Sequence, residues 1–243
     1  MEQIKARTPF ALLAAVLLAA LLSLAACSSP SAASSDSSEP SELPPQSSEA
    51  AASYTTAVDD SDPYGAGTHH AVMTIEGYGP VTIELDADEA PVTVANFCKL
   101  ADEGFYDGLN FYRFVDEFCM QGGSSNNSAT PADDGLTPIV GEFALNGVDN
   151  ALADDFKKGT VAMARSSNPN SADSTFFITL DTNSGVSQSL NGQYAAFGTI
   201  DADGMAVIDQ VVADYLPNVT DVQMGSIDDE SQQAKIESIR IVD

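Results

Sequence analysis

Residues 111–123 read FYRFVDEFCMQGG, which raises the question of why Arg113 stands among aromatic side chains. A short run of apolar and aromatic residues is typical of a buried strand. Arginine is scarce in this chain, which contains only Arg7, Arg113, Arg165 and Arg240. Burying a guanidinium costs free energy unless a partner binds it. We therefore expect Arg113 to bind a partner or take part in chemistry.

Segments on both sides of this stretch alternate or run apolar over strand length, between Gly, Asn and Asp residues. In chain order they read AVMTIEG, VTIEL, NFYRFV, FCMQ, TVAMAR, TFFITL, YAAFGTI and KIESIRIV. Two helices are also predicted. One covers residues 91–103, with Pro91 in its first turn and Gly104 after its end, and the other covers residues 204–215. This pattern predicts a closed or nearly closed β-barrel, or a sandwich with helical caps.

The N-terminal residues have the layout of a secretory signal peptide. Lys5 and Arg7 precede an apolar run that is too short to span a membrane, and the run leads to Cys27. Ala25 and Ala26, directly before Cys27, resemble the lipobox of bacterial lipoproteins. We expect a signal peptide over residues 1–26, a lipid on Cys27, and an extracytoplasmic protein anchored to a membrane. The alternative is an ordinary cleaved signal followed by a chance cysteine.

The next segment, residues 27–67, is rich in Ser, Pro, Ala and acidic residues. Such a composition cannot bury enough apolar surface to order itself, so we interpret it as a flexible tether. Residues 68–243 are long enough for one domain with a sizeable core. The net charge of −27 argues against nucleic acid or an anionic lipid surface as partner. A monomer is expected, whose contact with the membrane is through the lipid anchor.

Several familiar reactive sites are excluded by the sequence. The two histidines are adjacent, at positions 69 and 70, and no G-x-S-x-G motif occurs, which argues against a Ser-His-Asp triad. DADG at 201–204 resembles the start of a calcium loop but lacks its later ligands, so it is interpreted as a turn. Cys98 and Cys119 could form a disulfide, but both lie in apolar segments and are expected to be buried thiols.

The domain as a whole resembles the cyclophilin-type peptidyl-prolyl isomerases. The similar blocks cover residues 81–123, 141–180, 190–200 and 235–242, in the family's order. The resemblance implies an eight-stranded antiparallel closed β-barrel capped by two α-helices, with the active groove on its outer face. It also implies catalysed rotation of X-Pro bonds in proline-containing segments, without cofactor or metal. Together with the signal-like N-terminus, it predicts secreted or envelope proteins as substrates.

The resemblance carries the family's site residues over position by position. Arg113 takes the position of the catalytic arginine and Gln121 that of the glutamine beside it. The resemblance implies substrate-binding positions for the remaining members of the site: Phe118, Cys119, Ala164, Arg165, Ser166, Thr175, Phe177, Leu190 and Tyr194.

Three residues depart from the family's pattern. Cys119 stands where methionine is usual, Thr175 where glutamine is common and Ser189 where some members have tryptophan. These shorter side chains motivate an alternative, a proline-peptide-binding chaperone without useful turnover. The acidic charge motivates another, a surface assembly module that uses the barrel as a scaffold. The retained arginine and glutamine favour the isomerase.

Overall fold

The computed structural model describes residues 53–130, 132–180, 185 and 187–243. The predicted signal peptide, Cys27 and most of the predicted tether lie outside the described residues. Within the described part, no helix combines the length and apolar character needed to cross a membrane.

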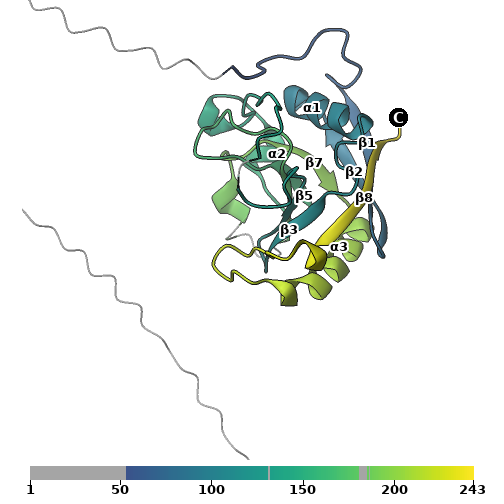
Figure 1. Cartoon of the computed structure of the whole chain (residues 1–243). Coiled ribbons are helices and arrows are strands. Elements are labelled where there is room, and N and C mark those ends of the chain that lie inside the picture. The colour runs from purple at the N-terminus through teal and green to yellow at the C-terminus, as the bar shows by residue number, and fades with distance from the viewer. Residues whose placement is uncertain (1–52, 131, 181–184, 186) are drawn as a thin grey trace, which may run out of the picture. The chain divides into compact units, whose positions relative to one another are not determined.

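Eight strands form a closed barrel (Figure 1). Their bounds are β1 Thr68–Ile75, β2 Gly79–Asp86, β3 Asn110–Val115, β4 Cys119–Gly122, β5 Thr160–Met163, β6 Phe176–Thr179, β7 Ala196–Ile200 and β8 Ala234–Ile241. Around the barrel they follow the order β1-β2-β7-β5-β6-β4-β3-β8, and every pairing is antiparallel. This confirms the expected architecture.

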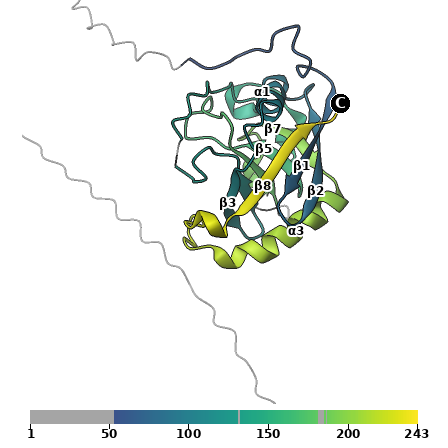
Figure 2. The same cartoon turned by 45° about the vertical axis from the view of Figure 1, so that its right-hand side comes forward.

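Two long helices lie at opposite ends of the barrel in Figures 1 and 2. They are α1, Pro91–Asp102, and α3, Ala202–Tyr215, close to the predicted ranges. The Asp201 side chain accepts a hydrogen bond from the Gly204 amide and caps α3. Shorter helices are α2, Ala151–Asp154, and the single 3₁₀ turns Ala144–Asn146, Ser187–Leu190, Leu216–Asn218 and Glu230–Gln232.

The barrel has apolar side chains on both faces of strands β4, β5 and β6. Inside, Phe176 and Ile178 belong to the main core, where Phe176 packs edge-to-face on Phe97 of α1 at 5.7 Å between ring centroids. Phe177, between them on β6, belongs to a second cluster that also contains Cys119 and Ala162. Because side chains alternate across a strand, this second cluster covers the outer wall of the barrel.

A bulge in β3 answers the question that Arg113 raises. Phe111 pairs with Gly122 and Arg113 with Gln121, so Tyr112 is an extra residue that β4 does not match. Phe111 and Phe114 are buried in the barrel core, while Tyr112 and Arg113, between them, are absent from that core. The bulge therefore places two consecutive polar-ended side chains on the outer wall.

Residues 53–67, which the sequence assigns to the tether, contact the domain. The Thr55 amide donates to the Pro138 carbonyl, and the Thr55 carbonyl accepts from the Val140 amide, both at 2.8 Å. Val58 packs against the core, and the Tyr64 hydroxyl donates to Asp102 at 2.7 Å. Described residues on the N-terminal side of the predicted boundary at residue 68 therefore pack against the domain. Isolated apolar residues in a polar segment gave no sign of this contact.

Cys98 and Cys119 are both free and buried, which confirms the expectation of two buried thiols. Burial raises the pKa of Cys98 to about 12. A thiol that stays protonated at neutral pH is a poor nucleophile, so the geometry favours a packing role for this residue.

Candidate active site

Two adjoining pockets open on the outer wall of the barrel. The first, which we call the arginine pocket, has a volume of about 250 Å³ and contains nine of the eleven predicted site residues. Its lining comprises Arg113, Phe118, Cys119, Gln121, Ala129, Ala164, Arg165, Phe177, Leu190, Tyr194 and Met224. The second, which we call the polar pocket, has a volume of about 310 Å³.

The guanidinium of Arg113 is held by acceptors on two sides. Its Nε–H donates to the Met224 carbonyl at 2.7 Å, and its Nη1 donates to Gln121 Oε1 at 3.0 Å and to Cys119 Sγ at 3.3 Å. The ring of Phe118 lies 5.7 Å from the guanidinium carbon. Among the described residues nothing accepts a hydrogen bond from Nη2, and no carboxylate forms an ion pair with this arginine.

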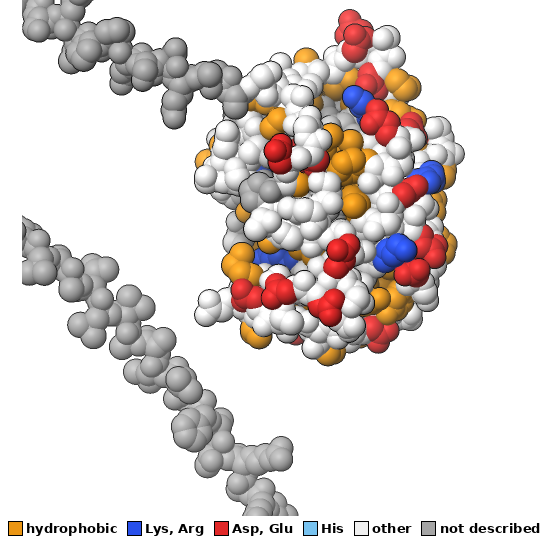
Figure 3. Space-filling model, viewed as in Figure 1, with side chains coloured by type: hydrophobic (Ala, Val, Ile, Leu, Met, Phe, Trp, Pro, Cys, Tyr) orange, Lys and Arg blue, Asp and Glu red, His pale blue; other side chains and the backbone are white. Residues whose placement is uncertain are grey.

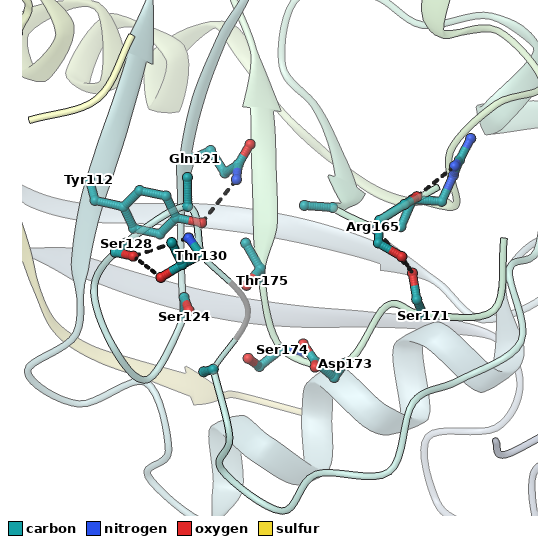
Figure 4. A pocket seen from close by; sticks show the side chains of 14 residues that line it. Tyr112, Gln121, Ser124, Ser128, Thr130, Arg165, Ser171, Asp173, Ser174 and Thr175 are labelled. Carbon is teal, nitrogen blue, oxygen red and sulfur yellow. Dashed lines mark hydrogen bonds between the residues drawn. The ribbon is translucent and has the colours of Figure 1, made fainter. Parts of the chain in front are cut away.

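Gln121 is itself fixed by the extra residue of the bulge. Its Nε2 donates to the Tyr112 hydroxyl at 2.9 Å, a contact drawn in Figure 4. With Nε2 donating in this way, Oε1 is the atom turned toward Arg113. The bulge thus sets the orientation of the amide that holds the guanidinium.

The floor of the arginine pocket is apolar. Phe177 is 4% exposed, and its ring packs nearly parallel to Phe156 at 6.3 Å and edge-on to Tyr194 at 5.5 Å. Burial raises the pKa of Cys119 to about 11, against the opposing effect of the nearby Arg113 charge, so this wall is a neutral thiol at physiological pH. The pocket therefore combines an apolar floor with a cation at its edge.

Arg165 lines both pockets. Its guanidinium carbon lies 4.7 Å from the ring centre of Tyr194 and 5.2 Å from that of Phe143. Its Nε–H donates to the Gln193 carbonyl and its Nη1 to the Ser166 carbonyl, both at 2.9 Å. These contacts fix the side chain without neutralising its charge.

Two of the predicted site residues, Ser166 and Thr175, lie in the polar pocket rather than the arginine pocket. Figure 4 shows Thr175 near Tyr112 and Gln121, whereas Arg165 lies across the pocket from them. The Ser166 hydroxyl donates to Ser171 Oγ at 2.8 Å. The pockets share Gln121, Ala129, Ala164 and Arg165, so one extended ligand could occupy both.

Two residues that line the arginine pocket, Ala129 and Met224, were not predicted from the sequence, and Met224 is the one that contacts Arg113. It belongs to an acidic segment beside β3, in which the Gly225 carbonyl accepts from the Phe114 amide at 2.8 Å and the Ile227 amide donates to the Tyr112 carbonyl at 2.9 Å. Met224 contributes a backbone carbonyl to Arg113. Because any residue type carries that group, no side-chain pattern signals the contact.

Known proteins resemble this chain in sequence and in fold. A family model described as cyclophilin type peptidyl-prolyl cis-trans isomerase/CLD matches residues 70–241. Peptidyl-prolyl cis-trans isomerase A of Dickeya dadantii is 34% identical over 163 residues, which cover 65% of this chain and 80% of that protein. A peptidyl-prolyl cis-trans isomerase of Streptomyces antibioticus is 37% identical over 137 residues, which cover 55% of this chain and 77% of that protein. The crystal structure of a cyclophilin type isomerase from Cryptosporidium parvum matches with a TM-score of 0.52 and 22% identity, over 73% of this chain and 99% of that one.

Proposed function

The chain belongs to the cyclophilin-type peptidyl-prolyl cis-trans isomerase family, and from this premise we propose that the arginine pocket is its catalytic centre and that its substrates are secreted or envelope proteins. The observation that supports the site is the guanidinium of Arg113, which is held at the edge of an apolar pocket and whose Nη2 donates to no described residue.

The reaction requires rotation about a bond with partial double-bond character. Amide resonance opposes this rotation by about 18 to 20 kcal/mol, and no covalent bond has to break. In the twisted transition state the prolyl nitrogen loses conjugation and regains a lone pair. A donor fixed near that nitrogen, or near the adjacent carbonyl, stabilises the twisted state more than the planar one, which is the condition for catalysis.

The arrangement around Arg113 suits this task. The Met224 carbonyl, Gln121 Oε1 and Cys119 Sγ hold the guanidinium in place before substrate arrives, so little reorganisation is needed during the reaction. One preorganised donor of this kind contributes about 3 to 4 kcal/mol to the transition state. An acceleration of about five decades needs roughly 7 kcal/mol. Binding of the proline ring against Phe177 and of the flanking peptide along both pockets would supply the rest.

The proposed cellular context rests on the N-terminal sequence. The signal-like residues 1–26 favour export, and the lipobox-like residues before Cys27 favour attachment to a membrane through acyl chains. A Ser- and Pro-rich tether would then allow the domain to reach proteins that fold near that membrane. We propose an isomerase that assists folding of extracytoplasmic proteins from a lipid-anchored position.

Replacement of Arg113 tests the catalytic assignment. Arg113→Ala is expected to lower turnover by about two to three decades, the effect of losing one preorganised donor. Arg113→Lys should also be impaired, because an ammonium lacks the planar fork that reaches Met224 and Gln121 together. Exchange spectroscopy by NMR on an Ala-Pro peptide measures turnover without a protease, and a thermal melt of each variant measures folding.

Arg240→Ala is the matched control. Arg240 forms a two-pronged ion pair with Asp107, at 2.7 and 2.5 Å, and lines neither pocket. Its removal should leave turnover unchanged. A folded Arg113→Ala variant with near-normal exchange would end the catalytic assignment, while an unfolded one would make Arg113 a structural residue.

A further inference from the structure

The lysine and arginine side chains of the described residues divide into those that form ion pairs and those that do not. Four of them form ion pairs with carboxylates: Lys157 with Asp155, Lys158 with Asp209, Lys235 with Glu76 and Arg240 with Asp107. Lys99, Arg113 and Arg165 form none within the described part of the chain. Two of these three line the arginine pocket.

This placement is unexpected from the composition. The chain has 36 acidic and 9 basic residues, and Figure 3 shows acidic side chains scattered over the face it presents. A guanidinium in such a chain has many carboxylates available as partners. The proposed catalytic role of Arg113 explains why its guanidinium has no carboxylate partner. No role described so far explains the same feature of Arg165.

The guanidinium of Arg165 is held in place and still has N–H groups that can donate to a ligand. Its two hydrogen bonds go to the backbone carbonyls of Gln193 and Ser166, which leave the charge uncompensated. Its contacts with the rings of Tyr194 and Phe143 restrict the side chain, so little conformational entropy would be lost when a ligand binds. Nη2 makes no hydrogen bond to any described residue. A carboxylate is the ligand that such a group binds best.

We propose that Arg165 is a specificity-determining residue that selects substrates with an acidic side chain close to the proline. This inference rests on the proposed site, with the proline ring in the arginine pocket. An extended peptide advances about 3.3 Å per residue, so a side chain within two residues of that proline can reach the border between the pockets where Arg165 lies. The preferred substrates are acidic prolyl segments.

The acidic groups nearby do not cancel this attraction. Asp173 also lines the polar pocket, where its Oδ1 accepts from the Ser174 amide at 2.5 Å. Figure 4 shows Asp173 beside Ser174, with the guanidinium of Arg165 directed away from it. The more distant carboxylates are screened over about 8 Å at physiological ionic strength. The attraction between Arg165 and a bound carboxylate therefore depends mainly on the groups in direct contact with them.

Matched peptides test the proposal. Each contains one Ala-Pro bond and one variable residue, Glu, Gln or Lys, at the first or second position on either side of that dipeptide. At 0.15 M salt, NMR exchange should give the Glu peptide a kcat/KM about three- to tenfold above that of its Gln counterpart at one or more positions, on the scale of a partly exposed charge-assisted contact. The Lys peptide should fall below both.

Variants of Arg165 assign the preference to its side chain. Arg165→Met should bring the Glu-to-Gln ratio close to one, and Arg165→Glu should favour the Lys peptide. Lys99→Met is the control, because it removes one unpaired charge from α1, outside both pockets, and should keep the wild-type ratio. Ratios of peptides on one protein are unaffected by its active fraction, and a melt identifies any variant that fails to fold.

Several outcomes would overturn the proposal. A wild-type protein that isomerises all the peptides equally would remove acid selectivity while leaving the isomerase site intact. A preference that persists in Arg165→Met would assign it to another group. If Arg165→Met does not fold, Arg165→Glu and the wild-type peptide series still decide the matter. Failure of the catalytic site itself would appear separately, as an Arg113→Ala variant with normal exchange on the neutral peptide.

Discussion

At the scale of single residues, the site depends on a chain of side chains that begins with Tyr112. The bulge puts Tyr112 on the outer wall, its hydroxyl accepts from Gln121 Nε2, and Gln121 Oε1 accepts from Arg113 Nη1. Burial raises the pKa of Tyr112, so this hydroxyl is neutral throughout the physiological range. Each link is a single hydrogen bond, so the orientation of the guanidinium can be altered one contact at a time.

Tyr112→Phe should lower turnover several-fold while the protein stays folded. The variant leaves Gln121 Nε2 without its acceptor, which allows the amide to rotate and present a donor to Arg113. A neutral hydrogen bond contributes about 0.5 to 1.5 kcal/mol, so the free energy of unfolding should fall by a similar amount. NMR exchange on the Ala-Pro peptide and a urea titration measure the two effects.

The control for this variant is Tyr78→Phe. The Tyr78 hydroxyl donates to Asp214 at 2.8 Å, away from both pockets, so this variant also removes one tyrosine hydroxyl and its hydrogen bond without touching the site. Equal loss of turnover in the two variants would contradict a positioning role for Tyr112.

Residue types predicted most of the candidate site but not the Met224 carbonyl that holds Arg113. Arg113, Gln121 and Phe177 could be found because the resemblance attaches roles to their side chains. The Met224 carbonyl could not be found, because it is a backbone group 111 positions away in sequence that reaches Arg113 through folding of the acidic segment. Nor did the sequence show that Ser166 and Thr175 belong to a separate pocket.

At the scale of elements, helix α1 begins without a cap of its own. Ala90 at its N-terminus offers no side-chain hydrogen bond. Glu142, which is 4% exposed, supplies the acceptors from a distant loop: Oε1 accepts from the Val92 amide at 3.0 Å, and Oε2 accepts from the Thr93 amide at 2.8 Å and its hydroxyl at 2.6 Å. A carboxylate here also interacts favourably with the helix dipole.

Glu142→Gln should destabilise the domain by about 1 to 3 kcal/mol at pH 7. The amide has one acceptor oxygen, so its NH₂ group must face an N–H or O–H donor that the carboxylate had satisfied. Urea titration measures the loss. Glu84→Gln, at an exposed position of β2, should change stability little. A Glu142→Gln protein as stable as the wild type would show that α1 does not depend on this contact.

The same pair of proteins should differ in pH dependence. Burial raises the pKa of Glu142 above its ordinary value of 4.5, against the lowering effect of its hydrogen bonds to Thr93 and Val92. The folded state therefore holds this proton more tightly than the unfolded state. The stability gained is complete below 4.5 and is lost as pH rises through the raised value.

The stability difference between wild type and Glu142→Gln should accordingly shrink as pH rises above 4.5. Asp107, whose pKa is lowered by its hydrogen bond to Arg240, acts in the opposite direction at lower pH, but it is present in both proteins and cancels. Urea midpoints of both proteins between pH 4 and pH 8 provide the test. A difference that widens with pH would contradict the raised pKa.

Residues 53–67 form a second element, and their contribution to the stability of the domain can be measured. A fragment of residues 68–243 contains all eight strands and should fold and retain turnover. It should be less stable than residues 53–243 by about 1 to 3 kcal/mol, because it lacks the Thr55 hydrogen bonds, the Val58 packing and the Tyr64–Asp102 contact. Thr55→Pro in the longer fragment removes one donor and should show part of the loss. Equal stability of the two fragments would mean that these contacts contribute nothing.

At the scale of the whole molecule, the sequence predicts where the strands lie more readily than which strands pair with each other. Periodicity located all eight strands, and β1–β2 and β3–β4 pair as their proximity in the chain suggests. Closure depends on β8, which pairs with both β1 and β3, and on β7, which lies between β2 and β5. Those pairings join segments far apart in sequence, so pattern alone left a barrel and a sandwich open. The family resemblance chose between them.

The last prediction concerns how the whole protein is held in the cell. If the lipobox-like residues function as proposed, the precursor is cleaved before Cys27 and acyl chains are attached to that cysteine, while Cys98 and Cys119 stay buried thiols. Each buried methylene of an acyl chain contributes about 0.8 kcal/mol to membrane binding, so a multiply acylated N-terminus would remain attached to the membrane.

Expression of the full chain in a bacterium should therefore place it in the membrane fraction. Intact mass should show a chain that begins at Cys27 and carries acyl groups. Cys27→Ala should lack the acyl mass and lose membrane attachment through it, whereas Cys98→Ala should be acylated like the wild type. Unmodified soluble wild-type protein with a different N-terminus would contradict the anchor and leave the isomerase domain unaffected.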